Sequence, residues 1–380
     1  MTVRPLHGLR VLELARILAG PWIGQALADL GAEVIKVEAP AGDDTRRWGP
    51  PFVGERGSAS YFHAANRGKR SVACDFAGPS DLALVRELAA GADVLIENFK
   101  VGGLARFGLD AATLRGAHPS LVYCSVTGFG QTGPYASRAG YDFLIQGMSG
   151  LMSVTGAPDG EPQKVGVAVT DIVTGLYGTI AIQSALLARH RTGEGAHVDM
   201  SLLDCATAMM ANQAASTLAT GTAPRRLGNA HPSIVPYQVF EAQGGPLIVA
   251  VGNDGQFARL CELLGLAELA EDPRFATNPG RVENREALVP LLSEAVARAE
   301  RDSLLAAMEA RTIPGGPIHD MAEALADPQL AARGMLIAPG GVTGLGTPIV
   351  MDGRAMAAER GAPELDEHGT EIREHGWSGA

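Results

Sequence analysis

The chain has 380 residues, of which 46% are hydrophobic and 19% charged, and its formal net charge is −11. This composition is typical of a packed soluble enzyme and excludes a disordered chain, and the acidic balance argues against general nucleic-acid binding. The four cysteines are scattered without a CxxC pair, so we expect neither a zinc site nor a redox motif. No signal segment or membrane-length apolar run is evident, which favours a cytoplasmic protein without membrane or nucleic-acid partners.

Strand-like and helix-like runs alternate from the N-terminus. Pro21 suits the first turn of a helix, Gly31 is a natural end for it, and Gly193 would end a long, largely buried helix. In chain order we expect strands at 10–14, 32–38, 92–99 and 120–130, helices at 21–30, 80–91 and 171–191, and a strand and helix within 196–218. Such alternation predicts a Rossmann-like α/β domain with a mostly parallel sheet and helices on both faces.

The composition changes near residues 221–240, which are rich in Pro and turn residues. A strand at 245–251 and amphipathic helices at 255–265 and 284–299 follow. We therefore expect three parts: a large Rossmann-like domain (1–225), a smaller α/β domain (226–328), and a segment (329–380) that returns to the large domain.

A strand–helix–strand start with Glu38 at the end of the second strand suggests dinucleotide binding. That fold presents phosphate-binding amides through a G-x-G-x-x-G turn, but the turn here reads "ARILAGPWIG". Gly20 is followed by Pro21 without the glycine pair, so a nicotinamide dehydrogenase is not expected. A Walker A sequence is absent as well.

Several glycine-punctuated segments resemble the family III CoA-transferases, also called the CaiB/BaiF family. The matching segments are "GLRVLELARILAGPWIGQALADLGAEVIKVE", "NRGKRSVACDF", "ADVLIENFKVGGLARFGL", "VTGFGQTGPYASRAGYDFLIQGMSG", "VAVTDIVTGLYG", "NPGRVENREAL" and "DPQLAARGM". The resemblance extends over nearly the whole chain. The resemblance implies an interlocked homodimer in which the large domain (1–225) binds CoA and carries out catalysis. It also implies CoA as a co-substrate, with no further cofactor or metal.

Asp171 is the one charged residue in the apolar run 165–178. From the sequence alone it could be a helix N-cap, since Asp is favoured there. The resemblance implies that Asp171 is the covalent nucleophile, and the two roles are compatible. An ionised carboxylate can attack a thioester without a base, and a helix N-terminus would keep it ionised.

A CoA site is expected to contain cations that bind the phosphates and a flat apolar slot that receives the adenine. Matching the family's motifs implies CoA-binding roles for Arg16, Lys69, Arg70, Asn98, Phe99, Arg106, Tyr141 and Asp142. Lys and Arg side chains are more often simply solvated, and Asp142 has a solvated loop acid as its alternative. Related racemases carry His where this chain has Tyr141, and Tyr is a poor base for moving a proton at carbon-2.

Two departures concern the acid that accepts CoA. Formyl-CoA transferases carry Gln where this chain has Leu18, and they carry a run of glycines where it reads "LGNAHPSIVPYQVF". The chain is closer in appearance to members that use succinyl-CoA and dicarboxylates. We expect the acid near Leu18, with Arg46, Arg47, His231 or Ser233 anchoring its distal carboxylate. His231 has a purely structural hydrogen bond as its alternative.

We therefore predict transfer of CoA from succinyl-CoA to a short dicarboxylic acid of the itaconate, mesaconate, citramalate or glutarate type, through a covalent aspartyl intermediate. Two alternatives stay open at this point. One is a 2-methylacyl-CoA racemase-like enzyme on the same fold, which Tyr141 disfavours. The other is a CoA-binding protein without catalysis, which an intact Asp171 disfavours.

Overall fold

The computed structural model describes residues 4–54 and 57–379, and the chain separates into two compact units. The large unit contains the chain up to Leu151, Lys164–Gly221 and the segment from Pro328 onward; the small unit contains Met152–Gln163 and Thr222–Asp327. These divisions lie within a few residues of the expected ones, except that 152–163 joins the small unit. The reason is local, because Arg226 donates from Nη2 to the Gly160 carbonyl at 2.7 Å.

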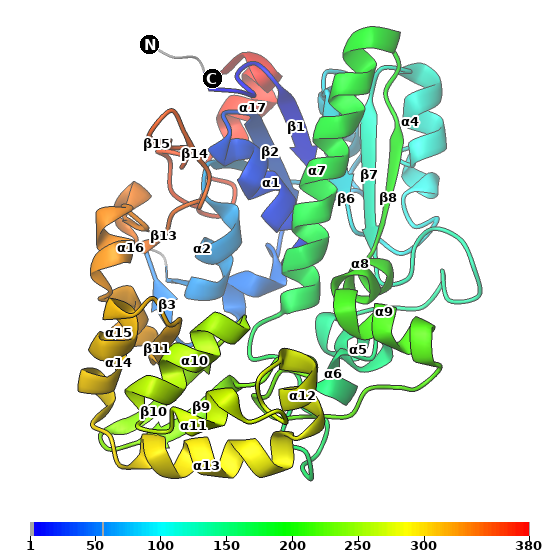
Figure 1. Cartoon of the computed structure of the whole chain (residues 1–380). Coiled ribbons are helices and arrows are strands. Elements are labelled where there is room, and N and C mark those ends of the chain that lie inside the picture. The colour runs from blue at the N-terminus through cyan, green and yellow to red at the C-terminus, as the bar shows by residue number, and fades with distance from the viewer. Residues whose placement is uncertain (1–3, 55–56, 380) are drawn as a thin grey trace. The chain divides into compact units, whose positions relative to one another are not determined.

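A six-stranded sheet forms the centre of the large unit, with the order β5-β2-β1-β6-β7-β8 and every neighbouring pair parallel (Figure 1). The α/β class with a parallel sheet is thus confirmed. Its strands are β1 (Arg10–Glu13), β2 (Glu33–Glu38), β5 (Lys69–Ala73), β6 (Val94–Glu97), β7 (Val122–Thr127) and β8 (His197–Ser201). The sequence analysis did not predict β5, because its first two residues, Lys69 and Arg70, are charged.

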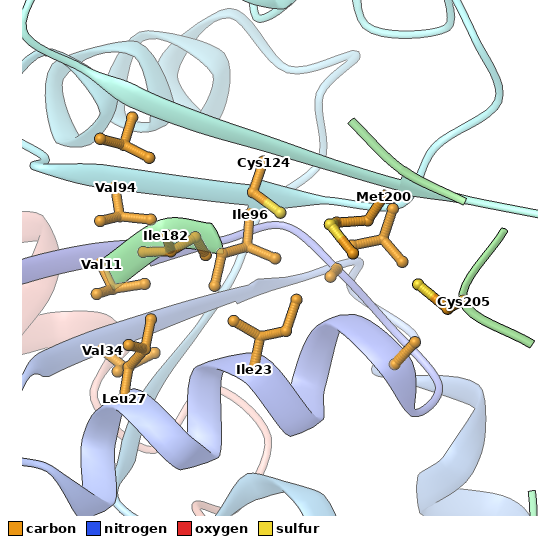
Figure 2. Packing of buried hydrophobic residues seen from close by; sticks show 14 of the residues in the cluster. Val11, Ile23, Leu27, Val34, Val94, Ile96, Cys124, Ile182, Met200 and Cys205 are labelled. Atoms are coloured by element: carbon orange, nitrogen blue, oxygen red, sulfur yellow. The ribbon is translucent and has the colours of Figure 1, made fainter. Parts of the chain in front are cut away.

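Helices cover both faces of this sheet. On one face, α1 (Ala19–Asp29), α7 (Val169–Thr192) and α8 (Leu202–Met209) pack on alternate strand residues, and Figure 2 shows Ile23, Leu27 and Ile182 meeting Val11, Val94 and Ile96. The other face is covered by α3 (Pro79–Ala90), α4 (Ala111–Ala117) and α17 (Gly369–His375). The four cysteines are buried and unpaired, and two of them, Cys124 and Cys205, belong to the core in Figure 2.

Helix α7 begins two residues before the predicted start and ends at Gly193, whose φ of 76° lies in the left-handed region that glycine tolerates. It lies close against α1, because a Cβ on Gly175 would come within 2.9 Å of Trp22. Within the described chain, α7 alone is long and apolar enough to cross a membrane by length and composition, a test that core helices of soluble proteins also pass.

The C-terminal segment completes the large unit. Trp377 and Ile372 are part of its second core, and the Trp377 Nε1 donates to the Leu88 carbonyl at 3.0 Å. At the edge of the sheet, Asp366 accepts the backbone N–H of Ala73 at 2.8 Å. The remaining elements of the large unit are α2 (Ser60–Asn66), α5 (Asp142–Met148), α9 (Ala211–Thr220), α16 (Pro328–Ala332), and the short strands β3 (Phe52–Val53), β4 (Ser58–Ala59), β12 (Leu336–Ile337), β13 (Gly344–Leu345), β14 (Val350–Met351) and β15 (Arg354–Ala355).

The small unit has a three-stranded antiparallel sheet of order β11-β10-β9. Arg281, from the segment "NPGRVENREAL", is fully buried there and donates to the Val235 and Phe275 carbonyls. This segment therefore stabilises the small unit. Its elements are β9 (Tyr237–Ala242), β10 (Gly245–Ala250), β11 (Gly315–Pro317), α10 (Asp254–Leu263), α11 (Glu268–Glu271), α12 (Asn278–Glu283), α13 (Arg285–Ala297), α14 (Arg301–Ala310) and α15 (Met321–Leu325).

Candidate active site

A cavity of about 540 Å³ opens in the large unit, where the chain leaves the carboxyl ends of β1, β6 and β7. The strand order runs outward in both directions from β1 and β6, and ligands of open parallel sheets bind at such switch points. Seven of the residues predicted from the sequence line this cavity together: Arg16, Leu18, Asn98, Phe99, Arg106, Tyr141 and Asp171.

Asp171 lies in the first turn of α7, three residues after the N-cap Ala168. It is therefore not the N-cap. Its carboxylate makes no hydrogen bond within the described residues, and burial together with the nearby Asp142 charge raises its pKa to about 7. The expectation that the helix would keep Asp171 fully ionised is thus offset by desolvation. At neutral pH the side chain is divided between a nucleophilic carboxylate and its acid.

Asp142 supports the start of α7 from the first turn of α5. Its Oδ1 accepts the backbone N–H and the hydroxyl of Thr170, at 2.9 and 2.8 Å, and its Oδ2 accepts from the Gln146 amide at 2.8 Å. Asp142 does not line the cavity, and these bonds show that it is not a solvated loop acid. It orders the residue directly before Asp171.

The cavity wall carries four cations. Besides Arg16 and Arg106, the structure brings in Lys100 and Arg138, which the sequence reading missed. Both were visible as charged residues in glycine-rich segments, "ENFKVGG" and "YASRAGY", which follow a strand end. Arg16 pairs with Asp44 at 2.7 Å, and within the described residues the other three cations form no ion pair. Such a cavity suits a substrate that carries several negative charges.

A stacked aromatic ring, Phe99, and an ordered loop lie beside these cations. The Phe99 ring stacks on Phe76, with centroids 6.2 Å apart and planes 18° apart. The Asn98 side chain binds both backbone groups of Arg16, accepting from its N–H at 3.0 Å and donating to its carbonyl at 2.7 Å. Asn98 therefore holds the loop after β1 while it lines the cavity.

Two glycines allow the cavity's remaining wall to form. A Cβ on Gly128 would lie 2.6 Å from the Gly140 Cα, and a Cβ on Gly140 would lie 2.5 Å from the Gly128 Cα. The two backbones therefore pass in direct contact, which only glycine permits. This contact positions Tyr141, whose side chain is 60% exposed.

Lys69 and Arg70, predicted to bind CoA, lie elsewhere. Both are buried in β5: Lys69 bonds the Glu13 carboxylate at 2.8 Å, and Arg70 pairs with Glu33 at 2.6 Å and Glu371 at 3.1 Å. The structure does not place either side chain at the cavity. β5 pairs with β2, and carboxylates from β1, β2 and α17 bind its two cations inside the large unit.

The predicted anchors for a distal carboxylate also fall outside this cavity. Arg46 is buried and bonds both oxygens of Glu38, at 2.7 and 2.8 Å, so its guanidinium is already paired. Arg47 is exposed and bonds Asp44 and the Ala41 carbonyl.

His231 and Ser233 belong to the small unit. The His231 Nδ1 accepts the Ser233 backbone N–H at 3.0 Å, which is the structural hydrogen bond anticipated as the alternative. Among the residues that the structure describes, no group of three or more His, Cys, Asp or Glu side chains could hold a metal ion.

A buried carboxylate with a raised pKa, at the switch point of a parallel sheet and beside cations, is typical of the active site of an α/β enzyme that acts on a charged substrate. The chain belongs to CoA-transferase family III, whose family model matches residues 6–369. It is accordingly a CoA-transferase.

Three similar proteins illustrate this membership. The chain is 54% identical to succinate-glutarate CoA-transferase of Agrobacterium fabrum, over 97% of this chain and 94% of that one. It is 43% identical to acetyl-CoA:oxalate CoA-transferase of Acetobacter aceti, over 97% and 95%. A crystal structure of a CaiB/BaiF family protein from Brucella suis matches with a TM-score of 0.89 at 58% identity, covering 98% of this chain and 99% of that one.

Proposed function

We propose that this enzyme transfers CoA from succinyl-CoA to a short dicarboxylic acid, with glutarate as the first candidate, through a covalent intermediate on Asp171. The observation that carries the proposal is the unbonded Asp171 carboxylate, with its pKa near 7, at a cavity lined by four cations. The similarity to a succinate-glutarate enzyme supports the choice of acids.

The proposed reaction proceeds by exchange of acyl bonds. The Asp171 carboxylate attacks the thioester carbonyl of succinyl-CoA, which forms a mixed anhydride and releases the CoA thiolate. The thiolate attacks the aspartyl carbonyl of the anhydride, giving an enzyme–CoA thioester and free succinate. Glutarate then attacks this thioester, and the released thiolate attacks the glutaryl carbonyl to form glutaryl-CoA and regenerate Asp171.

Each step breaks one acyl bond and makes another, so its atoms balance with CoA as the only co-substrate. The raised pKa of Asp171 also suits the chemistry, because a more basic carboxylate is a better nucleophile and a pKa of about 7 still leaves an ionised fraction at neutral pH. Arg16, Lys100, Arg106 and Arg138 supply positive charge for the CoA phosphates and the acid carboxylates.

We also propose that the enzyme works as a homodimer in the cytoplasm. Helix α7 presents Leu176, Ile180 and Leu187 at 50%, 59% and 71% exposure, and α5 presents Phe143 at 60%. Large apolar side chains gathered on one helix of a single chain are typical of a surface that another chain covers. The interlocked form implied by the family resemblance would supply that cover.

The test is intact-protein and peptide mass spectrometry after mixing the enzyme with succinyl-CoA, with hydroxylamine as a trap. We expect a CoA or acyl adduct on the peptide that contains Asp171, no adduct in Asp171→Asn, and normal adduct formation in Asp159→Asn, a matched change in an exposed loop. Glutarate should discharge the adduct faster than itaconate, mesaconate, citramalate or oxalate.

Two results would overturn parts of this proposal separately. Turnover with an adduct on another residue, or turnover by Asp171→Asn within about tenfold of the wild-type rate, would refute the nucleophile. Faster discharge by oxalate than by glutarate would refute the acceptor and leave the covalent chemistry in place.

A further inference from the structure

The loop between β1 and α1 contains a strained residue at the wall of the cavity. Ile17 has φ of 72°, in the left-handed region, although it is β-branched. Such a conformation is strained for a β-branched residue and persists only where surrounding contacts impose it. Ile17 lines the cavity between Arg16 and Leu18, and Asp171 lines the same cavity.

Three side chains hold the backbone of this loop in place. Lys36 donates from Nζ to the Ala15 carbonyl at 2.8 Å, and Asn98 binds both backbone groups of Arg16. Asp43 accepts the Ile17 N–H with both carboxylate oxygens, at 3.2 and 3.3 Å. Three consecutive residues thus have backbone groups bonded to side chains from other parts of the chain.

Two of these side chains form a buried ion pair. The Lys36 Nζ lies 3.0 Å from the Asp43 Oδ2 and 3.0 Å from the Glu13 Oε1, and both members of the pair are almost fully buried. Burial favours the neutral form of Asp43, but Lys36 and the Thr45 hydrogen bonds outweigh it and hold the pKa of Asp43 below its ordinary value. Asp43 therefore stays ionised at neutral pH.

Buried ion pairs contribute little net stability relative to apolar side chains of similar size. The role of the Lys36–Asp43 pair is therefore better explained by the backbone that it holds in place than by stability. Here the pair connects β2 to the loop after β1, and it bonds the one residue of that loop with a strained backbone. An apolar pair could not accept the Ile17 N–H.

We propose that Asp43, supported by Lys36, is a positioning residue for CoA transfer: it imposes the left-handed conformation of Ile17 and thereby holds the Arg16–Leu18 wall in the shape that receives the CoA ester beside Asp171. The proposal rests on CoA transfer at this cavity. Asp43 contacts no reacting atom in it, and acts through the Ile17 backbone.

A double-mutant cycle between Asp43→Asn and Ile17→Gly tests this. Asparagine keeps the size of the side chain but removes the charge and one acceptor, so the loop is free to relax; we expect kcat/KM for the CoA ester to fall about 10- to 100-fold. Glycine adopts positive φ without steric cost, so the loop depends less on Asp43 to keep its shape. In the Ile17→Gly background, Asp43→Asn should therefore lower kcat/KM by less than about threefold.

Asp29→Asn is the matched control. Asp29 forms a buried ion pair with Arg67 at 2.6 Å near the other end of α1, and it does not line the cavity. We expect Asp29→Asn to lower Tm about as much as Asp43→Asn, to change kcat/KM by less than about threefold, and to have the same effect in both backgrounds. A purely structural role for Asp43 would give the same pattern as this control.

Equal losses from Asp43→Asn in the wild-type and Ile17→Gly backgrounds would overturn the proposal. If Asp43→Asn does not accumulate as folded protein, Asp43→Glu takes its place in the cycle, because it keeps the negative charge beside Lys36 but moves the carboxylate away from the Ile17 N–H. Calorimetric Kd values for CoA provide a second readout of the same cycle. They require neither the acceptor acid nor a covalent step at Asp171, so a failure of the proposed reaction remains distinguishable from a failure of this inference.

Discussion

Asp142 accepts two hydrogen bonds from Thr170 through a single oxygen, one from the backbone N–H at 2.9 Å and one from the hydroxyl at 2.8 Å. The same carboxylate is the charge that, after burial, raises the pKa of Asp171 to about 7. Asp142 thus has two separable effects on the nucleophile: it orders the first turn of α7, and it tunes the ionisation of Asp171.

The first prediction concerns the acidic limb of the pH–rate profile. Because Asp171 reacts as the carboxylate, kcat/KM of the wild type should rise with pH around a midpoint near 7. Asp142→Asn keeps an oxygen for Thr170 but removes the charge, so the pKa of Asp171 falls and the midpoint moves to lower pH. Rates measured between about pH 5 and 9 with saturating acceptor check this, and an unmoved midpoint would contradict the electrostatic role.

The second prediction concerns stability. The pKa of Asp171 is raised on folding, so the folded state holds its proton over a range where the unfolded chain has lost it; stability is therefore lost as pH rises from about 4 to 7. Asp171→Asn removes the buried charge. It should lower kcat by about 10³-fold or more and raise Tm, with a larger rise at about pH 8 than at about pH 5. Calorimetry at both pH values measures this, and an equal Tm change would contradict it.

The third prediction concerns two cations of the cavity wall, of which the sequence reading missed one. Lys100→Ala and Arg106→Ala each remove one cation from the wall. Each should raise KM for the CoA ester about 3- to 30-fold while kcat changes little, with a smaller effect at high salt because the groups are partly exposed. Arg191→Ala, at the far end of α7, is the control and should leave KM unchanged. A fall in kcat alone would place these residues at the chemical step.

The fourth prediction concerns the contact between Gly128 and Gly140. Gly128→Ala places a methyl group where the Gly140 backbone lies, so the two segments must separate and Tyr141 moves with one of them. We expect kcat/KM to fall by about 10-fold or more. Gly116→Ala, whose added Cβ meets no atom within 4 Å, should be silent. Steady-state kinetics of the two variants provide the comparison.

The fifth prediction concerns assembly. Ile180→Asp places a charge on the exposed apolar side of α7, where a partner chain is proposed to pack. Light scattering after gel filtration should give twice the 39.4 kDa chain mass for the wild type and lower or aggregated fractions for the variant. A wild-type monomer would refute the proposed dimer.

The sequence was informative where the local chain determines position. Asn98 and Phe99, which the family resemblance assigned to CoA binding, line the cavity just after β6, and Asp171 was expected at the start of a helix. Gly193 marked the end of that helix because its conformation is local.

The sequence was uninformative where a partner distant in the chain determines the role. Lys69 reads as a solvent cation until the fold places Glu13 at 2.8 Å, and Arg46 reads as an anchor until Glu38 bonds its guanidinium with both oxygens. The left-handed backbone of Ile17 has no signal in its residue type, because the contact that holds it is the carboxylate of Asp43. Tertiary contacts, rather than spacing in the sequence, determine the partners of Lys69 and Arg46 and the backbone conformation of Ile17.

The place of Trp377 in the second core has a consequence for biosynthesis. Trp377 and Ile372 pack among residues of α3 and the central sheet, and both follow every strand of that sheet in the chain. While the ribosome is still holding those residues, one face of the sheet stays incompletely covered, although every strand has already emerged. A nascent chain therefore leaves part of that apolar face exposed until Ile372 and Trp377 emerge, and a stop codon placed before Ile372 would leave it exposed permanently.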